Sequence, residues 1–284
     1  MDKKVTIVGL GMIGGSLGMA IKKKNLARVI GLTRERSKCE RAVALKAVDY
    51  ASSNIKGIIQ GADIIFICYP IHLIIPEIKK IIQFVKPGTI ITDVGSTKEF
   101  IVSQAEKIMP KGVFFVGGHP MAGKEKTGIE EAEADLFNGR PYVLTRTKKT
   151  DGKALETLKV LVAKLGAKVS IMDPSEHDRV VAAISHMPVA IAASLIDSID
   201  HAGKLKKQMM DLSSSGLRDT TRIASGDPFL GTDMFTTNKK AVLEAINNFK
   251  RSLNTVTALI RKGGTESIAQ KLADVKKLRD SIFK

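Results

Sequence analysis

The chain has 284 residues, of which 44% are hydrophobic, so it can bury the core of one large domain or two ordinary ones. Its formal net charge of +16 attracts anions, which include nucleic acid, phosphorylated cofactors and carboxylate substrates. Because the lysines are scattered and tryptophan is absent, no platform for stacking bases is present, and we expect no nucleic-acid partner.

The first residues, MDKK, lead directly into a strand-like run, and the two cysteines, Cys39 and Cys68, form neither a disulfide framework nor a metal-ligand pattern. We expect no apolar run of the roughly 18 to 20 residues that a membrane span requires. The sequence therefore predicts a cytoplasmic protein without a membrane segment or a bound metal.

Short apolar runs alternate with helical patterns over residues 1–174. The apolar runs are VTIVGL, ARVIGLT, ADIIFICYP, GTIITDVG, GVFFVGGH, PYVLT and AKVSIMD, and the helical patterns cover 12–24, 36–45, 73–85, 98–108 and 153–165. This alternation indicates parallel strands joined by crossover helices. The runs are apolar throughout, which is typical of strands covered on both faces.

After Asp173-Pro174 the strand signal almost disappears. Helical patterns cover 177–201, 205–222, 239–262 and 265–283, with glycine and proline between them. We predict an α/β domain over 1–174 and an all-helical domain over 175–284. The helix that follows Ser185 is apolar nearly all round, which favours a position in a core or in an interface between subunits.

The stretch VTIVGLGMIGGSLG contains G-x-G-x-x-G between a predicted strand and a predicted helix. Gly9 allows the tight turn, Gly11 lets the backbone approach a pyrophosphate, and Gly14 permits close packing of helix on strand. In this context the motif predicts a Rossmann-type domain in which these glycines, Met12 and Ile13 contact a dinucleotide. The alternative is a tight turn without a ligand.

The end of the second predicted strand indicates which dinucleotide binds. NAD enzymes usually place an acidic residue there for the ribose 2′-hydroxyl, whereas this strand ends in Thr33, followed by Arg34 and, shortly after, Ser37. A hydroxyl and cations suit a 2′-phosphate, so these three residues predict NADP. NAD remains possible if Glu35 takes the acidic position.

His119 follows an apolar run and lies among Gly117, Gly118 and Gly123. In a sheet of parallel strands this position faces the ligand crevice. A neutral imidazole there can accept a proton from a substrate hydroxyl while hydride leaves for the nicotinamide. The alternative is a loop histidine that bonds its own turn.

Five segments together resemble the prephenate/arogenate dehydrogenases of tyrosine biosynthesis. They are GLGMIGGSLG, DVGSTK (93–98), GGHPMAG (117–123), SHMP (185–188) and SGLRDTTRIASGDP (215–228). The resemblance covers essentially the whole chain. It implies a Rossmann domain followed by a helical domain that forms a homodimer, in a stand-alone dehydrogenase.

The resemblance implies oxidative decarboxylation of a cyclohexadienol, in which the ring hydroxyl is oxidised and the ring carboxylate leaves as CO2. It assigns His119 as the proton acceptor, Ser96 as a hydrogen-bonding partner of the hydroxyl that also borders the cofactor, and Arg222 as the ligand of a substrate carboxylate. Further residues that the resemblance places at the site are His186 and Gly123 at the substrate, and Cys68 and Pro70 at the nicotinamide.

Two departures concern the substrate. Many prephenate-using members carry a second histidine where this chain has Val189, and a tryptophan in the region of Gly231. Both changes resemble the arogenate-preferring, NADP-dependent subset. Arogenate carries an ammonium where prephenate carries a keto group, and Glu125 is the nearest candidate to meet that charge, although it also suits a solvated loop. We therefore expect arogenate as substrate, with prephenate as the alternative.

Other histidines are expected outside the site: His72, His177 and His201 at the surface or as helix caps, with Ser175 capping the helix that contains His177. Three other functions stay open. A β-hydroxyacid-type dehydrogenase would rely on a lysine in the helical domain, an NADP-sensing protein would bind cofactor without catalysis, and a nucleic-acid-binding protein is suggested by the charge alone.

Overall fold

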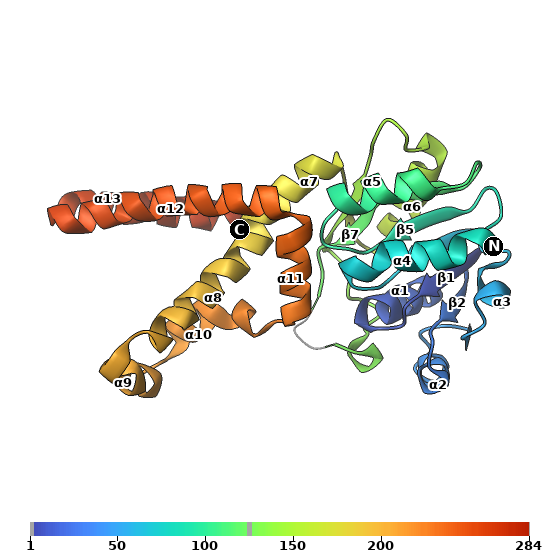
Figure 1. Cartoon of the computed structure of the whole chain (residues 1–284), viewed down its shortest axis with the longest axis horizontal. Coiled ribbons are helices and arrows are strands. Elements are labelled where there is room, and N and C mark those ends of the chain that lie inside the picture. Colours follow the sequence, from blue (N-terminus) through green and yellow to red (C-terminus); the bar gives the residue numbers. More distant parts are fainter. Residues whose placement is uncertain (1–2, 124–126, 284) are drawn as a thin grey trace.

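In the computed structural model, which describes residues 3–123 and 127–283, an α/β domain is followed by an arm of helices (Figure 1). The main sheet is parallel, in the order β3-β2-β1-β4-β5-β6. Its strands are β1 (Lys4–Val8), β2 (Arg28–Leu32), β3 (Tyr50–Ser52), β4 (Ile64–Ile67), β5 (Ile90–Asp93) and β6 (Phe114–Val116). The strand order reverses at β1, where open α/β sheets bind their ligands at the carboxyl edge. The predicted Rossmann-type α/β domain with a following helical domain is confirmed.

Helices cover both faces of this sheet. They are α1 (Met12–Lys23), α2 (Arg36–Ala44), α3 (Ile55–Ile59), α4 (Ile71–Ile81), α5 (Glu99–Ile108) and α6 (Gly152–Lys164). Successive residues of a strand point to opposite faces, so Ile64 and Phe66 of β4 join the core beneath α1 and α6, while Ile65 and Ile67 join the core beneath α4 and α5. Uninterrupted apolar strands are the consequence of burial on both faces.

A second, three-stranded sheet corrects one expectation. The runs PYVLT and AKVSIMD do not extend the main sheet but form β8 (Pro141–Thr145) and β9 (Lys168–Met172), and β8 pairs antiparallel with β7 (Gly118–Pro120). The run 113–119 is therefore divided between two sheets, and His119 lies within a strand. The division depends on glycine, because a Cβ on Gly118 would lie 2.7 Å from the carbonyl oxygen of Asp93.

The second part, residues 174–283, contains helices and turns without strands. Its helices are α7 (Pro174–Val181), α8 (Met187–Asp200), α9 (Lys206–Asp211), α10 (Ser215–Thr221), α11 (Pro228–Thr237), α12 (Lys239–Lys262) and α13 (Thr265–Ile282). Two predicted helices are interrupted. A break at 212–214 separates α9 from α10, and a π-helical turn, η3 (Ala182–His186), joins α7 to α8. Pro188 follows this turn, and its ring cannot sit over the carbonyl four residues earlier in a regular α-helix.

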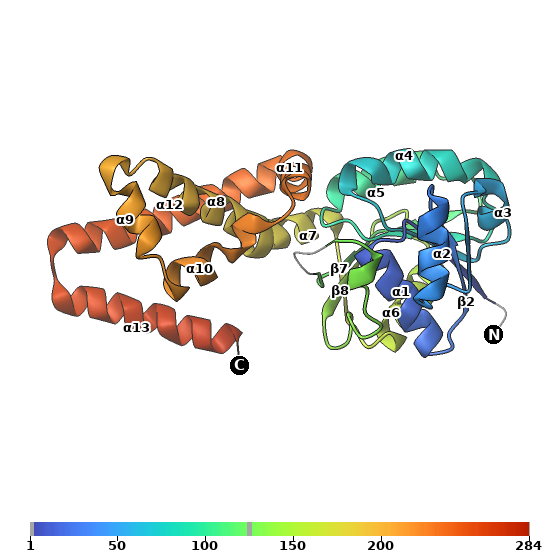
Figure 2. The ribbon, with the colours of Figure 1, turned by 90° about the horizontal axis from the view of Figure 1, so that it is seen from below.

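The arm extends away from the α/β domain, and α13 folds back along α12 (Figure 2). The continuous helical run Pro174–Asp200 is long and apolar enough to span a membrane by length and composition, with a mean hydropathy of 1.7 and 22% of its most apolar window buried. This corrects the expectation that no segment has such a composition. In α8 only Ala192 is buried, while Leu195 and Ile196 are exposed, so the single chain leaves an apolar helix face uncovered.

Candidate active site

The glycine loop joins β1 to α1 and is shaped by close contacts. Gly9 has φ +100°, and a Cβ there would lie 2.4 Å from the carbonyl oxygen of Cys68; a Cβ on Gly14 would lie 2.1 Å from the carbonyl oxygen of Gly9. A Cβ on Gly11 would instead meet nothing within 4 Å. Gly11 begins α1 without a side-chain cap from any described residue, and Met12 and Ile13 form the first turn. The first N–H groups of α1 therefore suit a pyrophosphate, and the loop fits a dinucleotide.

At the end of β2 the predicted NADP contacts differ in their surroundings. Thr33 is buried, Ser37 is exposed at the start of α2, and the guanidinium of Arg34 pairs with the carboxylate of Glu77 on α4. Glu77 is buried and also accepts from Lys80 Nζ at 2.6 Å. A cation is thus held at the strand end by an acidic side chain that the sequence reading missed.

The next predicted site residues follow the carboxyl ends of β4 and β5. Cys68 is half-buried, and its N–H donates to the carbonyl of Val8 at 2.7 Å; Pro70 is exposed and caps α4. Burial raises the pKa of the Cys68 thiol, which therefore stays protonated. After β5, the hydroxyl of Ser96 is buried and has no hydrogen-bond partner among the described residues. Since buried hydroxyls normally have a hydrogen-bond partner, this hydroxyl is suited to bond a ligand.

His119 is buried in β7. It lies beside the end of β5, since the N–H of the preceding residue, Gly118, donates to Asp93 Oδ1 at 3.2 Å. Its Nδ1 lies 2.8 Å from Nε2 of His177. Burial is the main cause that lowers the pKa of His119 well below its usual value, and the charges of His177, Lys98 and His186 act in the same direction. The imidazole is therefore neutral at neutral pH, which is the form that accepts a proton.

Lys98 is a site residue that the sequence reading did not single out. Its side chain is fully buried, pairs with Asp93, and donates to the carbonyl of Gly118 at 2.7 Å. Desolvation lowers the pKa of Lys98, while Asp93 acts against this shift. Lys98 thus fixes the strand that carries His119. The signal in the sequence was the charge pair in DVGSTK, five residues apart at the end of an apolar strand.

The expectation for His177 was wrong. Its side chain is fully buried and its Nδ1 lies 2.8 Å from Asp178 Oδ1. The cap of α7 is Asp173, which accepts from the N–H of Ser175 at 2.8 Å, and Pro174 occupies the first helical position. The N-cap of α7 is therefore two residues earlier than expected. His177 and Asp178 face the α/β domain rather than solvent.

The predicted substrate residues lie in several segments. His186 is buried in η3, its Nδ1 lies 3.2 Å from Asn238 Nδ2, and burial lowers the pKa of His186 to about 4. Arg222 is exposed at the start of the 3₁₀ turn η5 (Arg222–Ser225). Gly123 is exposed, and a Cβ there would lie 3.9 Å from Met12 Cε, beside the glycine loop. Glu125 lies outside the described residues.

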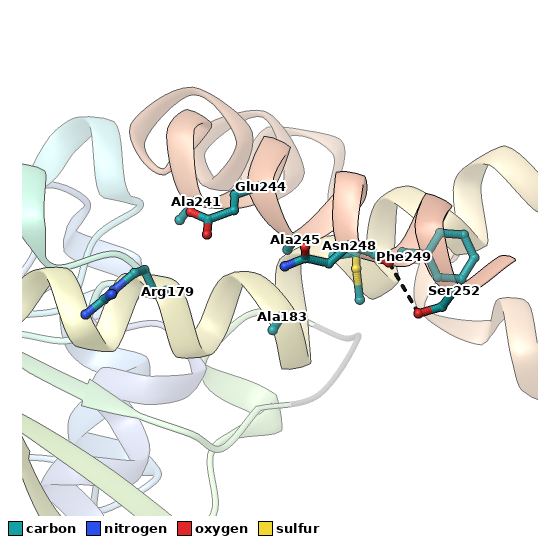
Figure 3. Close-up of a pocket in the computed structure, with 9 residues that line it drawn as sticks. Arg179, Ala183, Ala241, Glu244, Ala245, Asn248, Phe249 and Ser252 are labelled. Atoms are coloured by element: carbon teal, nitrogen blue, oxygen red, sulfur yellow. Dashed lines mark hydrogen bonds between the residues drawn. The ribbon is translucent and has the colours of Figure 1, made fainter. Parts of the chain in front are cut away.

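A separate hollow of about 340 Å³ lies on the helical arm (Figure 3). It is lined by Arg179, Ala183, Met187, Ala241, Glu244, Ala245, Asn248, Phe249 and Ser252. None of the lining residues is one that the sequence predicted for the site. The chemistry is therefore expected at the edge of the main sheet. The hollow is lined by α12 together with residues of α7, η3 and the start of α8.

The fold and the glycine loop define a class: a two-domain protein whose first domain is built to bind a dinucleotide and whose second is helical. Comparison with known families makes this specific. Residues 17–171 match the nucleotide-binding domain of prephenate dehydrogenase, and residues 173–274 match its dimerization domain. The chain therefore belongs to the prephenate dehydrogenase family.

Similar proteins include members with different substrate names. Synechocystis arogenate dehydrogenase is 38% identical, with a TM-score of 0.87 over 98% of this chain and 99% of that one. Prephenate dehydrogenase from A. aeolicus, solved in complex with hydroxyphenyl propionate and NAD+, is 32% identical, with a TM-score of 0.93 over 99% of both chains. Prephenate dehydrogenase of Bacillus subtilis is 34% identical over 99% of this chain and 76% of its own length.

Proposed function

We propose that this protein catalyses the NADP-dependent oxidative decarboxylation of arogenate to tyrosine. The observation that carries the proposal is His119, a neutral and buried imidazole at the carboxyl edge of the sheet, beside a loop built for a dinucleotide. The arogenate preference rests on Val189 and Gly231, where prephenate-using members often carry histidine and tryptophan. The second candidate is prephenate dehydrogenation with NAD or NADP, which the names of the relatives favour.

In this mechanism the bound nicotinamide supplies the acceptor for hydride. Since Nδ1 of His119 faces His177, Nε2 accepts the proton of the ring hydroxyl. The unpaired hydroxyl of Ser96 bonds the same substrate oxygen, and Arg222 binds a carboxylate. The oxidised ring then releases its carboxylate as CO2, and the electron pair of the broken bond completes the aromatic ring.

We further propose a cytoplasmic homodimer formed by residues 175–284. The match to a dimerization domain and the uncovered apolar face of α8 support it. The division at 174 is supported by the end of β9 at Met172 and the start of α7 at Pro174.

The test of substrate and cofactor is an initial-rate assay of four pairs: arogenate or prephenate, each with NADP or NAD. The expected result is the highest kcat/KM for arogenate with NADP. Activity only for prephenate with NAD would refute both specificity proposals and leave the family assignment intact. Absence of hydride transfer with all four pairs would favour a non-catalytic NADP-binding protein.

The role of His119 has its own test. His119→Asn removes the proton acceptor but keeps a small polar side chain, so kcat should fall by about a hundredfold or more. Cofactor binding should stay within about twofold of the native value, because the glycine loop is untouched. Turnover at the native rate would remove His119 from the mechanism.

A further inference from the structure

The buried pair His177 and Asp178 lies behind His119. The mechanism above uses His177 only to identify which ring nitrogen of His119 faces the substrate, and it gives Asp178 no part. Both belong to α7, in the segment that matches the dimerization domain, whereas His119 belongs to the nucleotide-binding domain. The three side chains form an unbroken chain of contacts: His119 Nδ1 to His177 Nε2 at 2.8 Å, and His177 Nδ1 to Asp178 Oδ1 at 2.8 Å.

The direction of these hydrogen bonds follows from Asp178. Its Oδ1 accepts from the N–H of Lys98 at 2.7 Å and its Oδ2 from the N–H of Glu99 at 3.0 Å. Two backbone donors favour the ionised carboxylate, which can only accept. Nδ1 of His177 therefore donates to Asp178. The single proton of the contact between the two rings is then placed on Nδ1 of His119, and Nε2 of His177 accepts it.

We propose that His177 and Asp178 are positioning residues that hold His119 in the Nδ1–H tautomer, with Nε2 bare for the substrate proton. This inference rests on the proposed function and goes beyond it by assigning the control of the base to the helical domain. When Nε2 of His119 takes the proton, Nδ1–H of the resulting imidazolium still donates to Nε2 of His177. The Asp178 carboxylate then stabilises the positive charge through the His177 ring.

The charged surroundings make this support necessary. Burial disfavours the charged form of His119 most. The charges of His177, of Lys98 at the start of α5 and of His186 in η3 act in the same direction. Asp93 is also a buried anion near this site, but its carboxylate pairs with Lys98 and not with His119. Among the described groups, Asp178 is the anion that reaches His119 through a hydrogen-bonded chain, so it is the counter-charge available during proton transfer.

A readout independent of activity tests the tautomer. The chain has five histidines, so ¹⁵N-histidine NMR spectra can be assigned by comparison with His119→Asn. We expect His119 of the native protein in the Nδ1–H tautomer, and His177→Leu to give a mixture of tautomers. A native His119 protonated at Nε2 would overturn the proposal, even if the four-pair assay succeeds. The expected tautomer with no turnover would instead refute only the proposed function.

Kinetics test the consequence. In His177→Leu, kcat should fall by about tenfold to a hundredfold, NADPH affinity should stay within about twofold, and the acidic limb of the kcat profile should move to lower pH because the imidazolium has lost its acceptor. His177→Gln returns an oxygen near the Nε2 position and should recover part of kcat and of the limb. His201→Leu, an exposed histidine of the same domain, is the matched control and should behave as native.

Equal behaviour of His177→Leu and His177→Gln, or an unmoved acidic limb in His177→Leu, would reduce His177 to a packing residue and overturn the proposal. If His177→Leu fails to bind NADPH, His177→Gln decides: a kcat within about tenfold of native supports the relay. A kcat as low as that of His119→Asn, with NADPH binding intact, contradicts it.

Discussion

Lys98 and Asp93 form an ion pair with fully buried side chains at the carboxyl end of β5. The pair is maintained by further bonds: Lys98 Nζ to the carbonyl of Gly118, and Asp93 to the N–H groups of Gly95 and Gly118. Removal of one partner of a buried pair leaves an uncompensated charge, which costs far more than the net contribution of the pair.

We expect Lys98→Met to lower the free energy of unfolding by about 3–5 kcal/mol, measured in urea, because Asp93 is left buried and unpaired. Asp93→Asn combined with Lys98→Met should recover part of the loss. The exposed Lys149→Met is the control and should change stability by less than about 0.5 kcal/mol. A similar small change in Lys98→Met would show that the carboxylate is not desolvated.

At the residue scale, His186 also makes the free energy of unfolding depend on pH. Its folded pKa of about 4 lies below the usual value of 6.5, so the unfolded chain binds the proton more tightly and stability falls as pH drops through this window. The loss between about pH 7.5 and about pH 5 should be about 2 kcal/mol. Urea midpoints at both pH values should show this loss reduced in His186→Asn; an equal loss in both proteins would assign it elsewhere.

At the scale of elements, the end of β2 and the second turn of α4 are joined by an ion pair on the side proposed for the cofactor. Arg34 is placed by Glu77, although 43 residues separate the two. If Arg34 contacts a 2′-phosphate, Arg34→Ala should raise KM for NADP by about tenfold or more and leave KM for NAD within about twofold. Arg36→Ala, which loses a pair with Glu40 on the solvent side of α2, is the control. An equal rise for both cofactors would place the 2′-phosphate elsewhere.

Element prediction failed where a contact outside the segment decides the conformation. The periodicity of α12 and α13 gave their bounds closely, since each is a long amphipathic pattern ended by Gly263 or by the chain's last turns. The split of 113–119 into β6 and β7 was not predictable from its apolar pattern. It depends on Asp93 of another strand, which receives the N–H of Gly118.

At the scale of the whole molecule, the uncovered face of α8 predicts self-association. Ile196 is exposed there in the single chain, and a carboxylate in an apolar interface is strongly unfavourable. Sedimentation at micromolar concentration should show a native dimer, and Ile196→Glu should shift it toward monomer while NADPH binding persists. Val160→Glu, on an exposed position of α6, should stay dimeric. A native monomer would refute the homodimer.

The sequence by itself determined the alternating α/β order, the glycine loop, the helical second part and His119 as the candidate base, because these depend on local spacing, turn chemistry and hydrophobic period. Only the tertiary structure revealed that His177, Asp178 and Lys98 surround that base. Their burial depends on how α7 packs against the loop before α5. The same run of charged residues and histidine would be compatible with a solvated helix face, so the sequence pattern does not distinguish the two. Hydrogen bonds between residues 58 and 80 positions apart, as for His119 with His177 and Lys98 with Asp178, exist only once the two domains are packed together.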